Sequence, residues 1–328
     1  MKVCIYGAGA IGGWIASALA RSGCSVSVVA RGAALDALQL HGLRLREGKT
    51  VTSQAVASSA SPAELGVQDL VVLAVKAPSL PEVARRIAPL LGPDTMILTA
   101  MNGVPWWFLQ GFGGALAGQR LLSVDPQGEL AQALPAQRII GCVVHASCSV
   151  DAPGLIRHHF GNGLIVGEPS GAATERVQAL AALLQRASFA ATVSPQIQKD
   201  IWFKLWGNMT VNPISAITCA TTDRILDDEL VRGFISAVML EAKEIGARFG
   251  IPIEQQPEDR HAVTRKLGAF KTSMLQDAEA GRAIELDSLV GAVRELGQHV
   301  GVETPLIDAI FGLARVFGQV HGLYPQPR

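Results

Sequence analysis

The sequence predicts an α/β protein in which a doubly wound, largely parallel sheet is followed by an all-helical C-terminal domain. Three observations predict this fold. The chain opens with a short apolar strand that runs into a glycine-rich turn and a helix. Residues 70–75 form an uninterrupted apolar run, which is typical of a parallel strand covered on both faces. From about Pro195 onward, helical patterns replace strand patterns, so we place the domains at residues 1–194 and 195–328.

The composition favours a chain that folds throughout and argues against several classes of partner. Apolar residues make up 49% of the 328 residues, and 28 basic residues balance 28 acidic ones. A balanced charge creates no field that would attract nucleic acid or an anionic membrane. The five cysteines are scattered without a C-x-x-C pair, so we expect reduced thiols in a cytoplasmic protein and no metal. A homodimer is left open.

The N-terminal turn contains a G-x-G-x-x-G pattern made of Gly7, Ala8, Gly9, Ala10, Ile11 and Gly12. A strand at 3–6 precedes the pattern, and a helix and a second strand at 26–29 follow it, which is the context of a dinucleotide site. The first glycine permits a tight turn, the second lets the backbone approach a pyrophosphate, and the third lets the helix pack closely on the strand. The helix N-terminus then faces the anion. We therefore predict a Rossmann-type domain, rather than an ordinary turn or the signal peptide that uncharged residues 3–20 superficially resemble.

The end of the second strand indicates which dinucleotide binds. A site that prefers NAD places an Asp or Glu there, whose carboxylate accepts from the ribose 2′-hydroxyl. This chain has Ala30 and Arg31 instead. A guanidinium can hold a 2′-phosphate by two charge-assisted hydrogen bonds, so we expect NADP(H). The alternative is that Arg31 is a solvated loop residue.

Two polar residues follow later strands of the predicted sheet. Lys76 comes after the strand at 70–75, and Asn102 comes after a strand at 96–99. Ligands of open α/β sheets bind at the carboxyl ends of the strands, so both residues are expected at the same rim as the glycine-rich turn. The alternative for each is a turn residue.

Further elements are predicted on both sides of residue 195: a helix at 35–40, strands at 43–45 and 51–57, a helix at 78–87, antiparallel hairpins at 139–166, and helices at 196–211, 228–249, 257–271, 284–300 and 304–320. Glycines and prolines set the ends of the C-terminal helices, Pro213 among them. His158 and His159 are interpreted as strand residues. We expect the catalytic residues in the cleft between the domains.

A polar stripe marks the first C-terminal helix. Lys204, Asn208 and Asn212 are spaced i, i+4, i+8 and so share one helix face. Large apolar residues surround them, and an unpaired polar group in such surroundings costs a few kcal/mol. A bound polar ligand would pair them; the alternative is a stripe that simply faces water. Pro213 biases Asn212 away from helical geometry, which predicts that Asn212 lies near a helix end and turns into the cleft.

The stripe suits the reduction of a ketone, which needs a hydride donor, an acid for the oxygen and anchors for the rest of the substrate. Lys204 can supply the acid, because a lysine with an ordinary pKa of about 10.4 is charged at pH 7 and partial burial lowers that pKa. The asparagines can orient a substrate without adding charge.

These motifs together resemble the ketopantoate reductase (2-dehydropantoate 2-reductase) family over nearly the whole chain. The matching blocks are the glycine-rich turn, Arg31, Val75-Lys76-Ala77, Asn102-Gly103, Lys204-Leu205, Asn208, Asn212-Pro213, Ser273 to Asp277 and Glu285-Leu286-Asp287. Their order and spacing are far more specific than any single block. The resemblance implies NADPH-dependent reduction of 2-dehydropantoate to pantoate, a step of pantothenate biosynthesis.

The resemblance also implies roles for individual residues in the substrate site. Lys204 is the implied general acid, and Asn208, Asn212 and Ser273 are the implied ligands of the 2-oxo acid. Without the resemblance, Ser273 could equally be a helix-surface residue.

The implied cofactor site draws on other parts of the chain. Lys76, Asn102 and Ser147 would contact NADPH, Ser147 at a strand end and Asn102 also touching the substrate. Glu285 would lie beside the nicotinamide and the reacting oxygen as a second catalytic residue. Without the resemblance, Glu285 could equally be a solvated acid.

Two departures from the family pattern put the substrate in doubt. Thr222-Asp223 stands where pantoate-forming members often carry Asn-Gly, and Val290 stands where they often carry an asparagine. One alternative is therefore a related reductase of a different 2-oxo acid. Another is a non-catalytic protein that senses NADP(H), although such a protein has no need of an acid beside the nicotinamide.

Overall fold

The computed structural model describes residues 1–326, and the chain divides into two compact units. Unit 1 comprises Met1–Met101 and Gly128–Asp200, and unit 2 comprises Asn102–Gln127 together with the chain from Ile201 onward. The segment Asn102–Gln127 thus packs with the helical part of the chain, although strands precede and follow it in the sequence.

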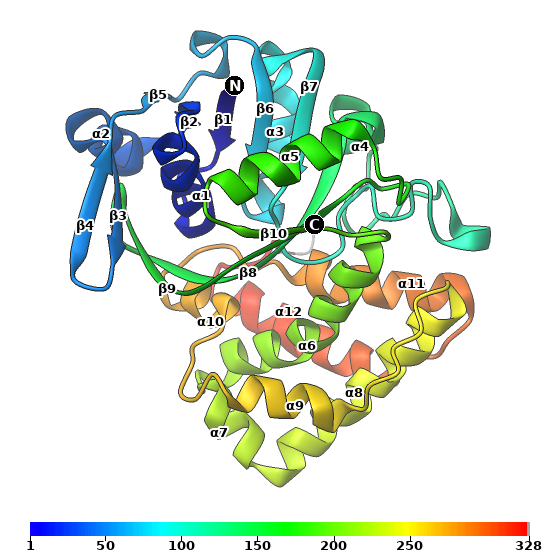
Figure 1. The fold of residues 1–328 in the computed structure, drawn as a ribbon. Coiled ribbons are helices and arrows are strands. Elements are labelled where there is room, and N and C mark those ends of the chain that lie inside the picture. Colours follow the sequence, from blue (N-terminus) through cyan, green and yellow to red (C-terminus); the bar gives the residue numbers. More distant parts are fainter. Residues whose placement is uncertain (327–328) are drawn as a thin grey trace. The chain divides into compact units, whose positions relative to one another are not determined.

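Unit 1 is built on a sheet whose strands, within the described residues, follow the order β4-β3-β9-β8-β7-β6-β1-β2-β5, with β10 pairing β9 (Figure 1). The strands are β1 Lys2–Tyr6, β2 Ser25–Val29, β3 Leu43–Glu47, β4 Thr50–Gln54, β5 Ala57–Ser59, β6 Gln68–Leu73, β7 Leu91–Thr99, β8 Ile139–Ala152, β9 Leu155–Gly167 and β10 Ala190–Val193. The predicted parallel core is confirmed, because β1 pairs in parallel with β2 and β6, and β7 pairs in parallel with β6. Of the antiparallel hairpins predicted at 139–166, one is confirmed as the pair β8–β9, which makes the sheet mixed, whereas β9 continues through residues 161–163 without a second turn.

Helices cover this sheet on both faces. The helices of unit 1 are α1 Ala10–Arg21, α2 Gly32–His41, α3 Leu80–Arg86, α4 Glu129–Ala133 and α5 Glu175–Arg186. In β1, Val3 and Ile5 belong to the same buried cluster as residues of α1 and α5, and the intervening Cys4 is buried as well. Continuous burial of this kind is what the apolar strand patterns predicted. Helix α5 and strand β10 were not predicted.

Unit 2 is helical, as predicted. Its elements are α6 Ile197–Thr218, which begins in unit 1, then α7 Thr222–Asp227, α8 Glu229–Arg248, α9 Pro257–Arg265, α10 Ser273–Glu279, a π-helical turn η6 Asp287–Gly291, α11 Ala292–Val300 and α12 Pro305–Val320. In the segment Asn102–Gln127 the structure has one short 3-10 turn, η4 Gly114–Leu116. Figure 1 shows α8 and α9 beside α6 within this unit.

The prediction that Pro213 ends a helix is wrong. Helix α6 continues through Pro213 to Thr218, so Asn212 lies inside the helix and not near its end. A proline inside a helix removes one backbone hydrogen bond and disfavours the helical state. Residues 209–216 are all buried, however, and packing of this length of helix outweighs the local preference.

Two other helix boundaries differ from the prediction. Helix α9 ends at Arg265 and not at 271, because Gly268 adopts the left-handed conformation with φ of 63°. The predicted helix at 284–300 begins as the π-helical turn η6 and becomes α-helical only at Ala292. Single π-helical turns occur frequently at functional sites, so the residues around η6 are candidates for a functional role.

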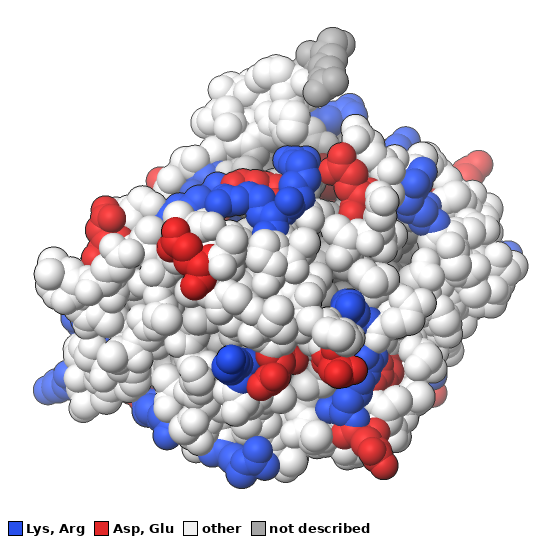
Figure 2. All heavy atoms as spheres, turned by 90° about the horizontal axis from the view of Figure 1, so that it is seen from above, with Lys and Arg blue, Asp and Glu red and all other residues white. Residues whose placement is uncertain are grey.

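Most of the face drawn in Figure 2 is uncharged, and the basic and acidic side chains that it carries lie side by side in small groups. This face therefore offers no large area of one sign. Among residues 1–326, no helix combines the length and the apolar character needed to cross a membrane.

Candidate functional site

The glycine-rich turn lies between β1 and α1, and its three glycines have different steric surroundings. Gly7 has φ of 112°, and a Cβ there would lie 2.7 Å from Ala74 O. A Cβ on Gly12 would lie 2.1 Å from Gly7 O, so only glycine lets α1 pack this closely on β1. A Cβ on Gly9 would meet no atom of residues 1–326 within 4 Å, which means that the space above Gly9 is open to a ligand. The turn has the shape that a pyrophosphate needs.

Arg31 lies where the sequence placed it, after β2 and at the start of α2, but it has a partner that sequence reasoning missed. Its Nη1 donates to both carboxylate oxygens of Glu82 in α3, each at 2.7 Å. Arg86 Nη1 donates to the same carboxylate at 3.2 Å. These hydrogen bonds, that of Arg31 first, hold the pKa of Glu82 below its usual range. Two guanidiniums and one carboxylate leave the cluster with one net positive charge.

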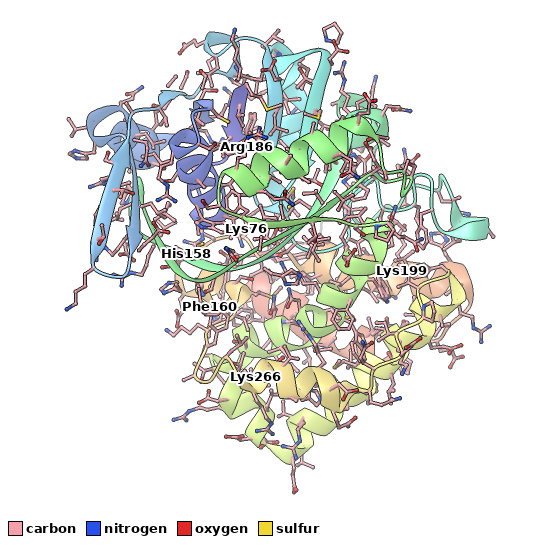
Figure 3. All side chains as sticks on the ribbon, in the orientation of Figure 1. Lys76, His158, Phe160, Arg186, Lys199 and Lys266 are labelled. Carbon is pink, nitrogen blue, oxygen red and sulfur yellow. The ribbon has the colours of Figure 1, made fainter. Side chains whose placement is uncertain are left out.

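Lys76 and Ser147, the other cofactor candidates of unit 1, lie on different elements. Lys76, labelled in Figure 3, is half-buried and follows β6 as the N-cap residue of the 3-10 turn η2 Ala77–Ser79. Ser147 is half-buried opposite Phe160, within β8 and not at a strand end as expected. The register of β8 shifts on both sides of Ser147, and such irregularities bend a strand without ending it.

The two histidines of the hairpin are strand residues, as predicted. His158, also labelled in Figure 3, lies in β9 and its ring stacks on Trp14 with centroids 5.5 Å apart. His159 Nε2 lies 2.9 Å from Ser149 Oγ across the hairpin. No group of three or more His, Cys, Asp or Glu side chains within the described residues could hold a metal ion.

The polar stripe of unit 2 occupies one continuous helix, α6. Lys204 and Asn208 are half-buried and Asn212 is 6% exposed. Neighbouring apolar residues are almost all fully buried, the exception being Phe203, which is 37% exposed. The helix therefore has no broad solvent face, and the stripe lies along its more open side.

Lys204 and Asn102 are 102 residues apart in the chain and are joined by a hydrogen bond. Lys204 Nζ donates to Asn102 Oδ1 at 2.8 Å. This bond holds the amine at a defined place. The structure thus unites two candidates that the sequence had assigned to different domains.

The turn that carries Asn102 also packs on the π-helical turn η6. Gly103 has φ of 83°, and a Cβ there would lie 2.6 Å from Ser288 O. Val104 N donates to that same carbonyl at 2.8 Å. Glu285, two residues before η6, is 5% exposed, and Ser288 Oγ donates to the backbone carbonyl of Glu285 at 3.3 Å. Glu285 is therefore a buried acid and not a solvated one. Ser273 is half-buried and begins α10, a separate element.

A half-buried acid–phenol pair beside Glu285 was not given a role by sequence reasoning. Tyr324 Oη donates to Asp287 Oδ1 at 2.7 Å. Burial raises the pKa of Asp287, and the hydrogen bond from Tyr324 opposes that rise. Ile284 N also donates to Leu323 O, so two hydrogen bonds join residues 323–324 to residues 284–287, the segment that contains Glu285 (the Glu285 turn). Asp287 and Tyr324 are 37 positions apart in the sequence, which explains why no local pattern showed the pair.

The sequence of the chain matches two family descriptions in tandem. Residues 3–171 match "Ketopantoate reductase PanE/ApbA", and residues 196–317 match "Ketopantoate reductase PanE/ApbA C terminal". The chain belongs to the ketopantoate reductase family. The two matches cover the glycine-rich turn, the Arg31 cluster, the α6 stripe and the Glu285 turn.

Individual relatives of the ketopantoate reductase family are similar over their full length. A 2-dehydropantoate 2-reductase of Mesorhizobium japonicum is 48% identical over 99% of this chain and 100% of its own. A crystal structure from Ralstonia solanacearum MolK2, which carries a provisional ketopantoate reductase name, is 55% identical with a TM-score of 0.95, covering 98% of this chain and 99% of that one. D-mandelate dehydrogenase with NADH and anilino(oxo)acetate has a TM-score of 0.84 over 98% and 100% of the two chains. At 20% identity, that last likeness is one of fold alone.

Proposed function

We propose that this protein reduces 2-dehydropantoate, or a closely similar 2-oxo acid, to the 2-hydroxy acid with NADPH. The observation that carries the proposal is the hydrogen bond from Lys204 Nζ to Asn102 Oδ1, because it holds a proton donor on the helix face that also bears two amides. Membership of the ketopantoate reductase family over nearly the whole chain supports the same chemistry.

Lys204 is the proposed general acid. As the ketone carbon accepts a hydride, the electron pair of the C=O double bond moves onto the oxygen. That oxygen takes a proton from Lys204 Nζ, which is left as a neutral amine and regains a proton from solvent. A positioned acid of this kind typically accelerates a reaction by about 10² to 10⁴. Glu285, buried beside η6, is the proposed second catalytic residue next to the reacting oxygen.

The other candidates position the substrate and the cofactor in this proposal. Asn208, Asn212 and Ser273 orient the 2-oxo acid. Lys76, Asn102 and Ser147 contact the cofactor, and Asn102 also touches the substrate. In terms of chain segments, residues 1–194 bind the dinucleotide and supply Asn102, and residues 195–328 carry the acid and the other substrate ligands.

The dinucleotide fits the glycine-rich turn, since the space above Gly9 is open while Gly7 and Gly12 fit closely against the protein. A bound nicotinamide would supply the hydride. We propose NADPH over NADH because Arg31 and Arg86 give this end of the site a net positive charge for a 2′-phosphate. Glu82 weakens that preference for NADPH, because its carboxylate already accepts hydrogen bonds from Arg31 and can itself accept a hydrogen bond from a ribose hydroxyl.

A substrate other than ketopantoate is the second candidate, and the two family departures favour it. Val290 is fully buried. Thr222 is 2% exposed, and its hydroxyl donates to Gly268 O at 2.8 Å. Neither side chain therefore offers a donor to the far end of a substrate. We expect at least one 2-oxo acid that lacks the terminal hydroxyl of ketopantoate to be reduced with a comparable kcat/KM, and a preference for ketopantoate above a thousandfold would exclude this candidate.

The test of the proposed function is a turnover screen of 2-oxo acids with NADPH, followed at the absorbance of the reduced nicotinamide. The expected result is oxidation of NADPH with ketopantoate and with a subset of other 2-oxo acids. Binding of NADPH without consumption in the presence of every 2-oxo acid would instead indicate a protein that senses the dinucleotide. The cytoplasmic location and a homodimeric state are proposals as well, and size-exclusion chromatography with light scattering tests the latter.

A further inference from the structure

Arg260, in α9, is a half-buried cation that the proposed mechanism does not use. Its Nε is buried and has no hydrogen-bond partner in the described part of the chain. Loss of water is the cause that lowers the pKa of Arg260, and no carboxylate among residues 1–326 offsets it. A charged group that loses water without a partner is strongly disfavoured, so this arrangement needs an explanation.

The guanidinium of Arg260 lies directly against α6. Its Cζ is 5.8 Å from the centre of the Phe203 ring. A Cβ on Gly207 would lie 2.4 Å from Arg260 Nε, so the absence of a side chain at Gly207 makes room for the guanidinium. Glycine disfavours a helix interior, and its presence in the middle of α6 therefore indicates that this space is required.

This place on α6 adjoins the polar stripe. Gly207 follows Lys204 by three residues and precedes Asn208, so at about 100° per residue it lies roughly 60° around the helix from Lys204. Residues three apart on a helix are surface neighbours. Arg260 thus contacts α6 at a residue that neighbours Lys204 on the helix surface.

Arg260 is not needed to hold α9 in place, because other contacts do so. His261 Nε2 lies 2.8 Å from Ser236 Oγ in α8. Arg265 donates to Asp227 Oδ1 at 2.8 Å and to Leu226 O at 2.7 Å, which fastens α9 to α7. A purely structural role for the Arg260 guanidinium would duplicate these bonds while adding the penalty of an unpaired charge.

We propose that Arg260 binds a carboxylate of the substrate. The inference rests on the proposed function, which requires an acidic substrate. The planar fork of an arginine matches a carboxylate with two parallel hydrogen bonds, which amides and a single ammonium cannot reproduce. The carboxylate is either the one bonded to the ketone carbon or a second one at the far end of a 2-oxo dicarboxylic acid.

The test measures binding of two unreactive analogues to the NADP⁺-saturated protein by calorimetry. Oxamate carries only the carboxylate beside the carbonyl, whereas N-oxalylglycine carries a second one. Arg260→Met, which removes the charge and keeps an unbranched side chain, is expected to weaken binding by about ten- to a hundredfold, the range for a hydrogen bond to a charged group. Arg265→Met removes a paired guanidinium from the same helix and is the matched control, with affinities within about twofold of the unmodified protein.

The two analogues distinguish the two sources of the carboxylate. Weakened binding of both supports contact with the carboxylate beside the ketone, and weakened binding of N-oxalylglycine alone supports a second carboxylate. Unchanged affinity of Arg260→Met for both analogues overturns the proposal, as does a failure of the unmodified protein to bind either. Arg260-dependent binding without turnover of any 2-oxo acid would contradict the proposed function while leaving this inference standing.

Stability without ligand separates binding from a structural role. Because the Arg260 Nε is buried without a hydrogen-bond partner in the described part of the chain, Arg260→Met is expected to have a Tm equal to or higher than that of the unmodified protein, whereas loss of a structural anchor would lower it. Gly207→Ala gives a second variant that keeps the charge. Its Cβ displaces the guanidinium, so we expect weaker analogue binding. Alanine also has a higher helix propensity than glycine, so the substitution does not weaken α6 itself. Undiminished analogue binding by Gly207→Ala, with the Tm of Arg260→Met lowered, would overturn the proposal.

Discussion

Gly9→Ala separates the fold of the glycine-rich turn from its ability to bind a dinucleotide. Gly9 precedes α1 with φ of −77° and ψ of −173°, a conformation that alanine adopts without strain. Its Cβ would meet no atom of the described residues within 4 Å, so the added methyl has room when no ligand is bound. The expected cost in the free energy of unfolding is that of alanine at a helix N-cap in place of glycine, at most about 1 kcal/mol.

The added methyl projects into the space that the pyrophosphate is predicted to occupy. Backbone donors at the start of α1 could no longer approach the phosphates, so the affinity for NADPH is expected to fall at least tenfold, about 1.4 kcal/mol or more. Fluorescence titration with NADPH measures this, alongside thermal denaturation. Gly233→Ala in α8 adds a methyl in equally open space and is the matched control, with NADPH affinity unchanged. Native stability with undiminished NADPH affinity in Gly9→Ala would refute the assignment of this turn to the dinucleotide.

Three further predictions concern charge. NADPH should bind about tenfold more tightly than NADH, or more. In titrations, Arg31→Ala should remove most of that difference in affinity, and Glu82→Gln should widen it. Equal affinities of the unmodified protein for NADPH and NADH would contradict the roles of Arg31 and Glu82. Lys204→Ala should lower kcat by about 10² or more and leave the Kd of NADPH nearly unchanged. The control is Lys199→Ala, near the exposed start of the same helix, which should alter neither kcat nor Kd. An undiminished kcat in Lys204→Ala would show that Lys204 has only a structural role. Burial raises the pKa of Asp287, so the native state favours its neutral form and loses stability as the pH rises through that raised pKa. Asp287→Asn should therefore raise the Tm at pH 7, with the advantage shrinking in acid, and an advantage that grows on acidification would contradict this.

The sequence allowed the parts of the fold that rest on local patterns to be predicted. The glycine-rich turn could be placed because three glycines at fixed spacing stand between a strand and a helix, and the parallel core because its strands are continuously apolar. The prediction at Pro213 failed because it considered the conformational bias that a proline imposes on the preceding residue and left packing out, whereas residues 209–216 are all buried. Burial of this extent is a property of the assembled unit and cannot be seen in a single helix.

In the candidate site, too, features that depend on local spacing were predicted and features that depend on long-range packing were not. Lys204, Asn208 and Asn212 were placed on one face because helical periodicity is local. The partners of the charged groups were not predictable, because Glu82 lies 51 residues from Arg31 and Tyr324 lies 37 residues from Asp287. Such pairs carry no spacing signal. The hydrogen bond between Lys204 and Asn102 likewise depends on the packing of Asn102–Gln127 with the helical unit, which no local pattern indicated.

The central claim is that a hydride reaches the ketone carbon of a 2-oxo acid, and isotope transfer tests it most directly. The unmodified protein is mixed with ketopantoate and NADPH that carries deuterium at both C4 positions, and the product is analysed by mass spectrometry. We predict pantoate with a single deuterium at C2, formed in step with the loss of reduced nicotinamide. Unconsumed NADPH, or pantoate without deuterium at C2, would contradict the claim.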